Sequence, residues 1–132
     1  MRELAVRLSE GMDLKKSIQE IAKENNICAG VLLSAAGCVR EIHLRRAKAQ
    51  SDFYNKDAYE IVSVTGTIAD NGVHIHISAT DEAMNTVGGH LLEGTIIDTT
   101  CELVIGILEE FHFHREFDSS TGYKELVAKR ID

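Results

Sequence analysis

The sequence predicts an α+β fold, a single domain over residues 1–132 with a mixed, mainly antiparallel β-sheet and a helix packed on it. Most of the chain alternates polar and apolar residues with the period of two that is typical of strands, whereas one segment has helical spacing. An Asn-Gly pair between two β-rich runs indicates a hairpin. The length fits about one ordinary domain with its own core.

The N-terminal region predicts a strand and then a helix. Leu4, Val6 and Leu8 alternate with mostly polar neighbours, as in a half-buried strand. After Gly11 the pattern changes, and Asp13 is a suitable N-cap for a helix that ends near residues 25–26. The apolar positions with helical spacing are 14, 18, 21 and 22.

The rest of the chain predicts strands. Residues 27–34 are rich in Val, Leu and Ile and indicate a central strand that Gly37 closes, followed by a short strand at residues 42–44. The polar segment 50–57 is predicted to be a loop. Further strands are expected at residues 59–68, 73–79, 86–97, 102–108 and 123–127, with the Asp70-Asn71-Gly72 turn after the first of them and a polar loop at 118–122.

Composition and charge narrow the classes of protein. Three widely spaced cysteines, Cys28, Cys38 and Cys101, argue against a disulfide framework and indicate buried free thiols. The N-terminus has no apolar stretch typical of a signal peptide, and the uncharged run at residues 27–39 is too short to span a membrane. We therefore expect a cytoplasmic protein without a membrane partner.

The net charge of −7 opposes binding to DNA, because phosphate neutralisation by cations supplies most nonspecific DNA affinity. A local exception is the group Arg40, Arg45, Arg46 and Lys48, which Glu41 and His43 interrupt. This group is either a solvated strand face or the best support in the sequence for a DNA contact.

Three histidines dominate the segment VHIHISATDEAMNTVGGHLLEG. In a strand, His74 and His76 project from one face about 7 Å apart, while Val73, Ile75 and Ile77 take the other face. Two imidazoles with this spacing can bind one metal ion. The spacing alone also fits histidines that face solvent or form hydrogen bonds, and both interpretations stay open.

His90 is the natural third ligand, because the chain between Ile77 and Gly89 is long enough to turn back and form a neighbouring strand. Gly88 and Gly89 would allow close backbone approach there. Three neutral imidazoles leave zinc with an open fourth position. Glu93 is the candidate catalytic residue, either a general base or a group that orients a ligand, and its alternative is an exposed strand glutamate.

Other candidate sites are weaker. A second pair, His112 and His114, alternates with Phe111 and Phe113 and predicts a strand with an aromatic core face rather than a metal site. The sequence contains no phosphate-binding loop, no convincing dinucleotide fingerprint and no nucleophile motif.

Three segments together resemble the PPC (plants and prokaryotes conserved) domain family: GMDLKKSIQEIAKENNICAGVLLSAAGCVREIHLR, VHIHISATDEAMNTVGGHLLEGTIIDTTCELVI and REFDSSTGYKEL. The resemblance covers about residues 4–127, and GGHLLEG after HIH is its most specific part. Prokaryotic members are stand-alone domains, and plant members carry AT-hook segments that bind the DNA minor groove. The family label "predicted DNA-binding protein" comes from those plant members. This chain contains no proline and therefore no such hook.

The resemblance implies a mixed sheet with a packed helix, assembled as a homotrimer. It also implies an architecture similar to zinc-dependent acetolactate decarboxylase and to a zinc ester hydrolase, whose three histidine ligands correspond to His74, His76 and His90. Many members lack this histidine set, so the fold does not require the metal.

Three hypotheses about function follow from the sequence and the resemblance. The first is a trimeric PPC-domain protein of unassigned role, with an open three-histidine site for zinc or a similar divalent metal. The second is a DNA-binding or DNA-associated regulatory protein that acts as an interaction platform. The third is a zinc-dependent hydrolase or a decarboxylase-like enzyme.

Overall fold

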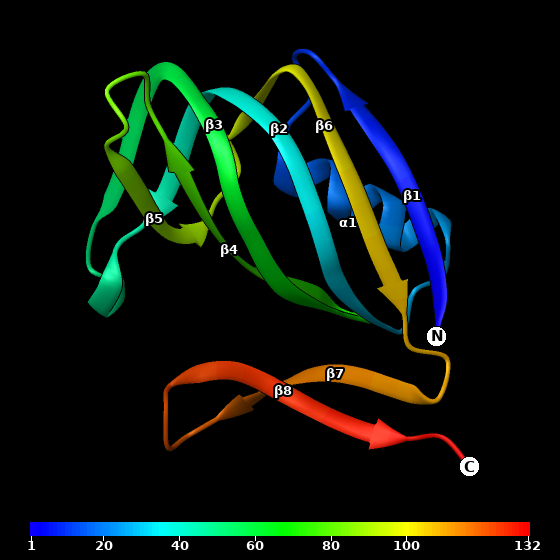
Figure 1. Ribbon diagram of the computed structural model, residues 1–132. Helices are drawn as coiled ribbons and strands as arrows, with labels where there is room; N and C mark the ends of the chain where they lie inside the picture. The colour runs from blue at the N-terminus through cyan, green and yellow to red at the C-terminus, as the bar shows by residue number, and fades with distance from the viewer.

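A computed structural model describes all residues 1–132 as a curved β-sheet with one α-helix beside it and a separate β-hairpin (Figure 1). The elements follow the order β1 (Arg2–Ser9), α1 (Leu14–Glu24), β2 (Ala29–Arg45), the 3-10 turn η1 (Ala47–Ala49), β3 (Asp52–Ala69), β4 (Gly72–Thr80), β5 (Thr86–Leu91), β6 (Ile96–Ile107), β7 (Phe111–Asp118) and β8 (Tyr123–Arg130).

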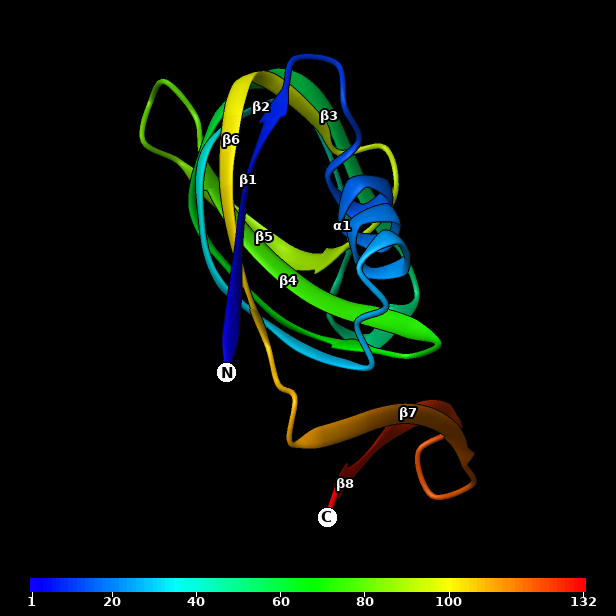
Figure 2. The same cartoon turned by 90° about the vertical axis from the view of Figure 1, so that its right-hand side faces the viewer.

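The main sheet has the strand order β1-β6-β2-β3-β4-β5. It curls until β5 also pairs with the C-terminal end of β2, where Leu44 lies opposite Leu91 and Arg45 opposite His90 (Figure 2). Every pairing is antiparallel, which confirms the mainly antiparallel character that the sequence predicted and corrects the expectation of a mixed sheet. The reason is topological: α1 connects β1 to β2, but β6 lies between these two strands and pairs with both.

The predicted helix is confirmed, and its sequence explains both ends. Asp13 caps it, with the carboxylate Oδ1 accepting a hydrogen bond from the Lys16 amide at 2.9 Å. The Asn25 amide donates to the Ile21 carbonyl at the other end. Leu14, Ile18 and Ile21 are buried, and the helix lies along the open side of the curved sheet (Figure 2). Burial of each such side chain stabilises the fold by about 1.5–3 kcal/mol.

The strand predictions were wrong in three places. Residues 29–45 form one long strand with register shifts rather than two strands, since Gly37 lies against the Thr100 backbone, where no side chain would fit. The polar segment 50–57 is largely strand, because residues 52–56 pair with the polar end of β2. Residues 86–97 are divided by a turn, in which the Leu92 amide donates to the His43 carbonyl.

The β7–β8 hairpin lies apart from the main sheet and contacts the turn between β3 and β4 (Figure 1). The Asp70 amide donates to the Phe113 carbonyl at 2.8 Å, and the Phe113 amide donates to the Cys28 carbonyl at 2.9 Å. The Arg115 amide donates to Asn71 Oδ1 at 2.8 Å, while Asn71 Nδ2 donates back to the Arg115 carbonyl. The hairpin predicted at residues 70–72 is thus confirmed, and its turn also holds β7.

The three cysteines are free thiols, as predicted. Cys101 is buried and burial raises its pKa to about 11, Cys38 is partly buried, and Cys28 is exposed, which corrects the expectation of three buried thiols. None of the helices combines the length and the apolar character that a membrane span requires.

Candidate metal centre

Strands β4 and β5, at one end of the strand order, carry the three predicted histidines. On β4 the side chains of Ile75 and Ile77 are buried in the core. His74 and His76 alternate with them and therefore project from the outer face. On β5, Leu91 is buried and His90 therefore projects outward as well. All three imidazoles lie on one face of the sheet.

The register of the strands brings His90 to the other two. His90 lies directly opposite His76 in the β4–β5 pair. The glycine before it has a specific role, because a Cβ at Gly89 would lie 2.8 Å from the carbonyl oxygen of Arg45. The missing side chain lets the end of β2 approach β5 and closes the curved sheet, which confirms the expected close approach at this glycine.

The three imidazoles offer ring nitrogens that all lie within 4.8 Å of one another. Nε2 of His74 is 3.2 Å from Nε2 of His76. The ring centroids are separated by 4.9 Å for His74 and His76, 5.3 Å for His74 and His90, and 5.7 Å for His76 and His90. This geometry suits a metal ion, since two nitrogens that each bind tetrahedral zinc at about 2.0–2.1 Å lie about 3.3 Å apart.

Electrostatics favours the neutral form of two of these imidazoles. Burial lowers the pKa of His74, and the neighbouring His76 and Arg115 lower it further. Burial also lowers the pKa of His90 to about 4, with Arg45 as the next cause. His90 Nδ1 is buried without a hydrogen-bond partner. A neutral imidazole has the free lone pair that a metal ligand needs, so the donor set fits a divalent metal.

Glu93 is not brought to the histidines. It follows the end of β5 in an exposed turn, and its backbone carbonyl accepts a hydrogen bond from His43 Nδ1 at 2.7 Å. It does not line the cavities that border the three imidazoles. A catalytic or orienting role for its carboxylate stays a prediction.

The second histidine pair has a different environment. His112 and His114 lie on β7 beside the buried Phe113, as the aromatic pattern predicted. The Asp70 carboxylate accepts a hydrogen bond from each ring: His112 Nε2 lies 2.6 Å from Oδ2, and His114 Nδ1 lies 2.7 Å from Oδ1. These hydrogen bonds, above all that of His112, hold the pKa of Asp70 below its usual value. No local pattern signals this contact, because Asp70 and His112 are 42 positions apart in the chain.

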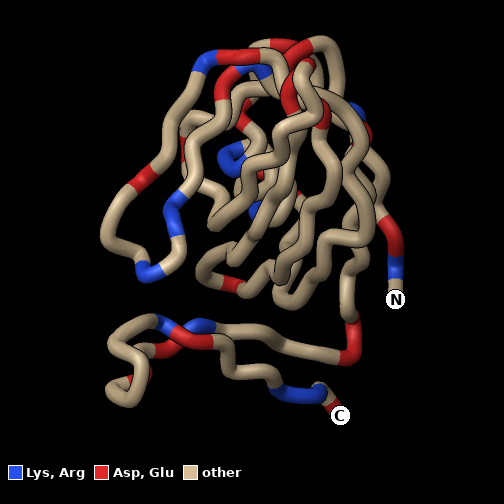
Figure 3. Tube along the Cα trace, turned by 60° about the vertical axis from the view of Figure 1, so that its left-hand side comes forward, with Lys and Arg blue, Asp and Glu red and all other residues tan.

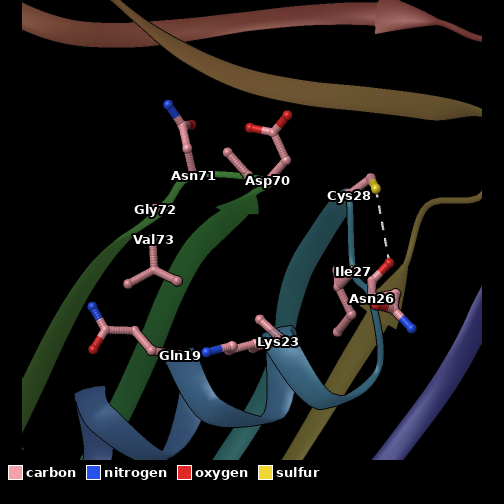
Figure 4. A pocket seen from close by; sticks show the side chains of 11 residues that line it. Gln19, Lys23, Asn26, Ile27, Cys28, Asp70, Asn71, Gly72 and Val73 are labelled. Carbon is pink, nitrogen blue, oxygen red and sulfur yellow. Dashed lines mark hydrogen bonds between the residues drawn. The ribbon is translucent and has the colours of Figure 1, made fainter.

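The largest cavity, about 560 Å³, contains none of the predicted site residues. It lies between the C-terminal end of α1 and the β3–β4 turn, with Lys23, Asn26 and Cys28 around it (Figure 4). At its edge, Asp70 and Asn71 point toward the ribbon of the hairpin (Figure 4). Two smaller cavities, of about 470 and 230 Å³, border the histidines instead.

The chain matches one known protein family over most of its length. The Plants and Prokaryotes Conserved (PCC) domain matches residues 1–109. The chain belongs to the PCC domain family. The resemblance seen in the sequence is thereby confirmed, over the segment that includes the sheet, the helix and all three site histidines.

Two relatives of this PCC domain are proteins named bifunctional protein GlmU. The one from Synechococcus sp. (strain JA-3-3Ab) is 35% identical over 131 residues, and the one from Synechococcus sp. (strain JA-2-3B'a(2-13)) is 37% identical over 126 residues. The matches cover 99% and 96% of this chain, but the chain spans only 21% and 20% of the length of these relatives.

Solved structures of PCC-like proteins have the same fold. A hypothetical protein from Salmonella enterica matches with a TM-score of 0.94 and 29% identity, over 98% of this chain and 94% of that one. A metal-containing protein from Archaeoglobus fulgidus matches with a TM-score of 0.77 and 27% identity, over 96% and 94%. A presumed DNA-binding protein from Bacteroides thetaiotaomicron has a TM-score of 0.85 at 23% identity, over 95% and 91%, and shares the fold.

Proposed function

We propose that this PCC domain binds zinc or a similar divalent metal through His74, His76 and His90. The observation that carries the proposal is the meeting of three ring nitrogens within 4.8 Å on one face of the sheet. These imidazoles have no carboxylate partner, and the contact between Nε2 of His74 and Nε2 of His76 is one that a bound metal ion would replace. The metal content of the Archaeoglobus fulgidus protein, which is 27% identical, supports the same proposal.

The chemistry of such a site follows from its ligand number. Three histidines leave a fourth position open to water or to an oxygen of a ligand, and zinc bound in this way acts as a Lewis acid. A closed structural site would have four protein ligands, and no cysteine or carboxylate joins the group of three here. The arrangement therefore fits a site of hydrolase or decarboxylase type better than a structural staple.

The role of the protein's own residues at this site is orientation. Strands β4 and β5 fix the backbone of all three histidines, and the pairing of His76 with His90 sets the distance between them. Rigid strands hold ligands more accurately than loops do. Glu93 is proposed to serve as base or orienting group only after a shift of the turn that follows β5, because its side chain is exposed.

Self-association as a homotrimer is part of the proposal. Exposed apolar side chains lie on the hairpin, where Phe117 is 68% exposed and Tyr123 is 52% exposed. A large apolar side chain in this position gains free energy when a partner covers it. Light scattering coupled to gel filtration should give three times the chain mass, and a mass equal to one chain would remove the trimer from the proposal.

DNA binding is the second candidate, and the basic group predicted from the sequence bears on it. Arg40 is paired with Glu10 at 2.9 Å, so it is not free to contact phosphate. Arg45, Arg46 and Lys48 do lie together, beside the histidines. They are too few to overcome a net charge of −7 on an extended duplex, where each phosphate contact adds to affinity.

The metal proposal is tested by elemental analysis of protein purified without a histidine tag or a nickel column. We expect about one divalent metal ion per chain, since three imidazoles form one site. The variant in which His74, His76 and His90 are all replaced by Ala should lose it. The matched control replaces His112 and His114 by Ala, and it should retain the metal. Equal metal content in the unmodified protein and the triple variant would contradict the proposal.

A further inference from the structure

We propose that the histidine site takes a small anionic ligand, one that carries a carboxylate or phosphate group, and that Arg45 and Arg115 bind this group. The inference deepens the proposed metal function and rests on it for the identity of the reacting site. Three observations support the inference: the register of the strands, the positive charges that line two cavities, and the scarcity of carboxylates near Arg45 and Arg115.

Arg45 lies on one side of the three histidines. It is the last residue of β2 and lies directly opposite His90 in the β2–β5 pair. Side chains in directly opposite positions project from the same face and lie about 5 Å apart at their Cβ atoms. The close approach at Gly89 is what places this arginine there. The guanidinium of Arg45 also lies 5.9 Å from the ring centroid of Tyr123, at the start of β8.

Arg115 lies on the other side. Its guanidinium Nη2 donates to Thr67 Oγ1 at 3.0 Å, and Thr67 lies directly opposite His74 in the β3–β4 pair. The guanidinium is therefore beside His74, although it comes from the hairpin. Its Nε is buried and has no hydrogen-bond partner. Two guanidinium groups thus flank the three imidazoles, one next to His90 and one next to His74.

Arg45 lines both of these cavities that border the histidines, and Arg115 lines the smaller of the two. The cavity of about 470 Å³ is lined by Arg45, Arg46, Lys48, His76, His90 and Tyr123, among others. The cavity of about 230 Å³ is lined by Arg45, His74, His90, Arg115, Lys124 and Glu125, among others. Its volume suits a small molecule, and Glu125 is the single carboxylate in either lining.

The cations at the two cavities have no carboxylate partner, whereas three arginines elsewhere in the chain do. Arg2, Arg40 and Arg130 each lie within 4.0 Å of a glutamate oxygen. The five cations at the two cavities form no such ion pair: Arg45, Arg46, Lys48, Arg115 and Lys124. The chain has seven more acidic than basic residues, yet these cations lie together without acidic partners. Their positive charge favours the binding of an anionic ligand.

The arrangement of the elements creates this concentration of charge. Lys and Arg positions at the end of β2 and in the loop that contains η1 lie opposite those of the hairpin along the chain trace (Figure 3). Residues of both groups line the cavities that border the histidines. A guanidinium can donate two parallel hydrogen bonds to a carboxylate or phosphate, which fixes the ligand's orientation as well as its position. A ligand held this way presents its neighbouring oxygen atoms to the three imidazoles.

A small anion fits these observations better than duplex DNA does. The cations surround two cavities at the histidines and do not form a continuous stripe, because Arg40 is paired with Glu10 and lines neither cavity. Duplex binding requires cations spread along many phosphates. The ligand class is therefore a small carboxylate or phosphate ester.

The test is an NMR titration of the full chain, with arginine side chains and backbone labelled with ¹⁵N. Inorganic phosphate is titrated into metal-free protein, and acetate is titrated into metal-free and zinc-loaded protein, all at constant ionic strength. R45Q and R115Q each remove one of the two guanidinium groups. R40Q is the matched control, since it removes an arginine from the same strand as Arg45 but outside both cavities. R115K keeps the charge and shows whether the hairpin still docks.

We expect saturable shifts at Arg45 and Arg115 in the unmodified protein, and dissociation constants about tenfold higher in R45Q and R115Q. R40Q should bind as the unmodified protein does, and R115K should lie between. Tighter binding of phosphate assigns a phosphate ester, and tighter binding of acetate assigns a carboxylate. If the protein holds no zinc but anion binding still depends on Arg45 and Arg115, the metal proposal fails and this inference stands.

Two results would overturn the inference. One is anion affinity that is the same in the unmodified protein, R45Q and R115Q. The other is a short DNA duplex that binds more tightly than either small anion and depends on Arg45, since the cations would then serve nucleic acid.

Discussion

The molecule contains two histidine clusters with the same HxH spacing and opposite chemistry. His74 and His76 on β4 meet His90 and leave their ring nitrogens facing one another. His112 and His114 on β7 meet Asp70 and form hydrogen bonds of 2.6 and 2.7 Å with it. The second cluster joins the hairpin to the main sheet, whereas the first cluster has no such structural contact to make.

The difference lies in what stands opposite each pair. A carboxylate accepts the imidazole N–H and satisfies it, and the cluster then stabilises the docking of two elements. A third imidazole opposite the pair adds another ring nitrogen and no negative charge, which is why we propose that this group binds a cation. The spacing of two histidines in a sequence thus says less about function than the residue that the fold brings to them.

Loss of one of the three proposed metal ligands should have the largest effect, and the quantity affected is the affinity for zinc. Replacing His90 by Ala leaves two imidazoles, and we expect zinc affinity to fall by more than about 100-fold, since even loss of a group that only supports a ligand costs about 10–100-fold. Competition with a fluorescent zinc chelator measures it. His114→Ala, a histidine of the other cluster, should leave zinc affinity unchanged. A similar loss in both variants would show that the two clusters do not differ as described.

A smaller effect is expected from a residue that touches no metal. A Cβ at Gly89 would lie 2.8 Å from the Arg45 carbonyl oxygen, so Gly89→Ala should push β2 away from β5. We expect a loss of about 1–3 kcal/mol in the free energy of unfolding, together with weaker zinc binding. Gly72→Ala is the control, because its Cβ would meet only an Arg115 side-chain carbon at 3.8 Å. Urea denaturation measures both, and equal stability of the two variants would contradict the role of Gly89.

The smallest effect concerns the second cluster and acid. The His112 hydrogen bond, followed by that of His114, holds the pKa of Asp70 below its usual value of 3.8. A carboxylate with a lowered pKa in the folded state stabilises that state above pH 3.8, and this contribution is lost as the pH falls through the lowered pKa. Hydrogen exchange at the Phe113 and Arg115 amides measures the docking of β7.

The control for this prediction is Asp70→Asn. Its hairpin amides should exchange faster than those of the unmodified protein above pH 3.8, and the difference should shrink as the pH falls below it. Zinc affinity should not change. A difference in amide exchange rate between the two proteins that grows toward lower pH would contradict this prediction.

Much of the fold could be predicted from residue patterns, and the failures have physical causes. The helix followed from its Asp13 cap and its apolar spacing, and the Asn71-Gly72 pair gave the β3–β4 hairpin. The length of β2 was missed because Gly37 resembles a terminator but lies where two backbones nearly touch. The polar start of β3 was missed because it contributes only Phe53 to the core, and its pairing with the end of β2 is a contact between distant residues.

The candidate site was predicted in part. The alternation of β4 placed His74 and His76 on one face, and the length of chain up to Gly89 predicted the neighbouring strand that brings His90 opposite His76. Arg115 had no signal in the sequence, since the hairpin returns to the sheet through contacts with Asn71 and Thr67. Such contacts between distant segments depend on packing, and no local pattern encodes them.

The central claim is that the three facing imidazoles bind a metal, whereas the pair that faces Asp70 does not. X-ray diffraction from tag-free crystals, with anomalous data collected on both sides of the zinc absorption edge, tests it most directly. The account predicts one anomalous peak within about 2 Å of a ring nitrogen of His74, His76 and His90, and none at His112 or His114. A zinc-supplemented crystal with no peak between the three imidazoles, or with a peak beside Asp70 instead, would contradict it.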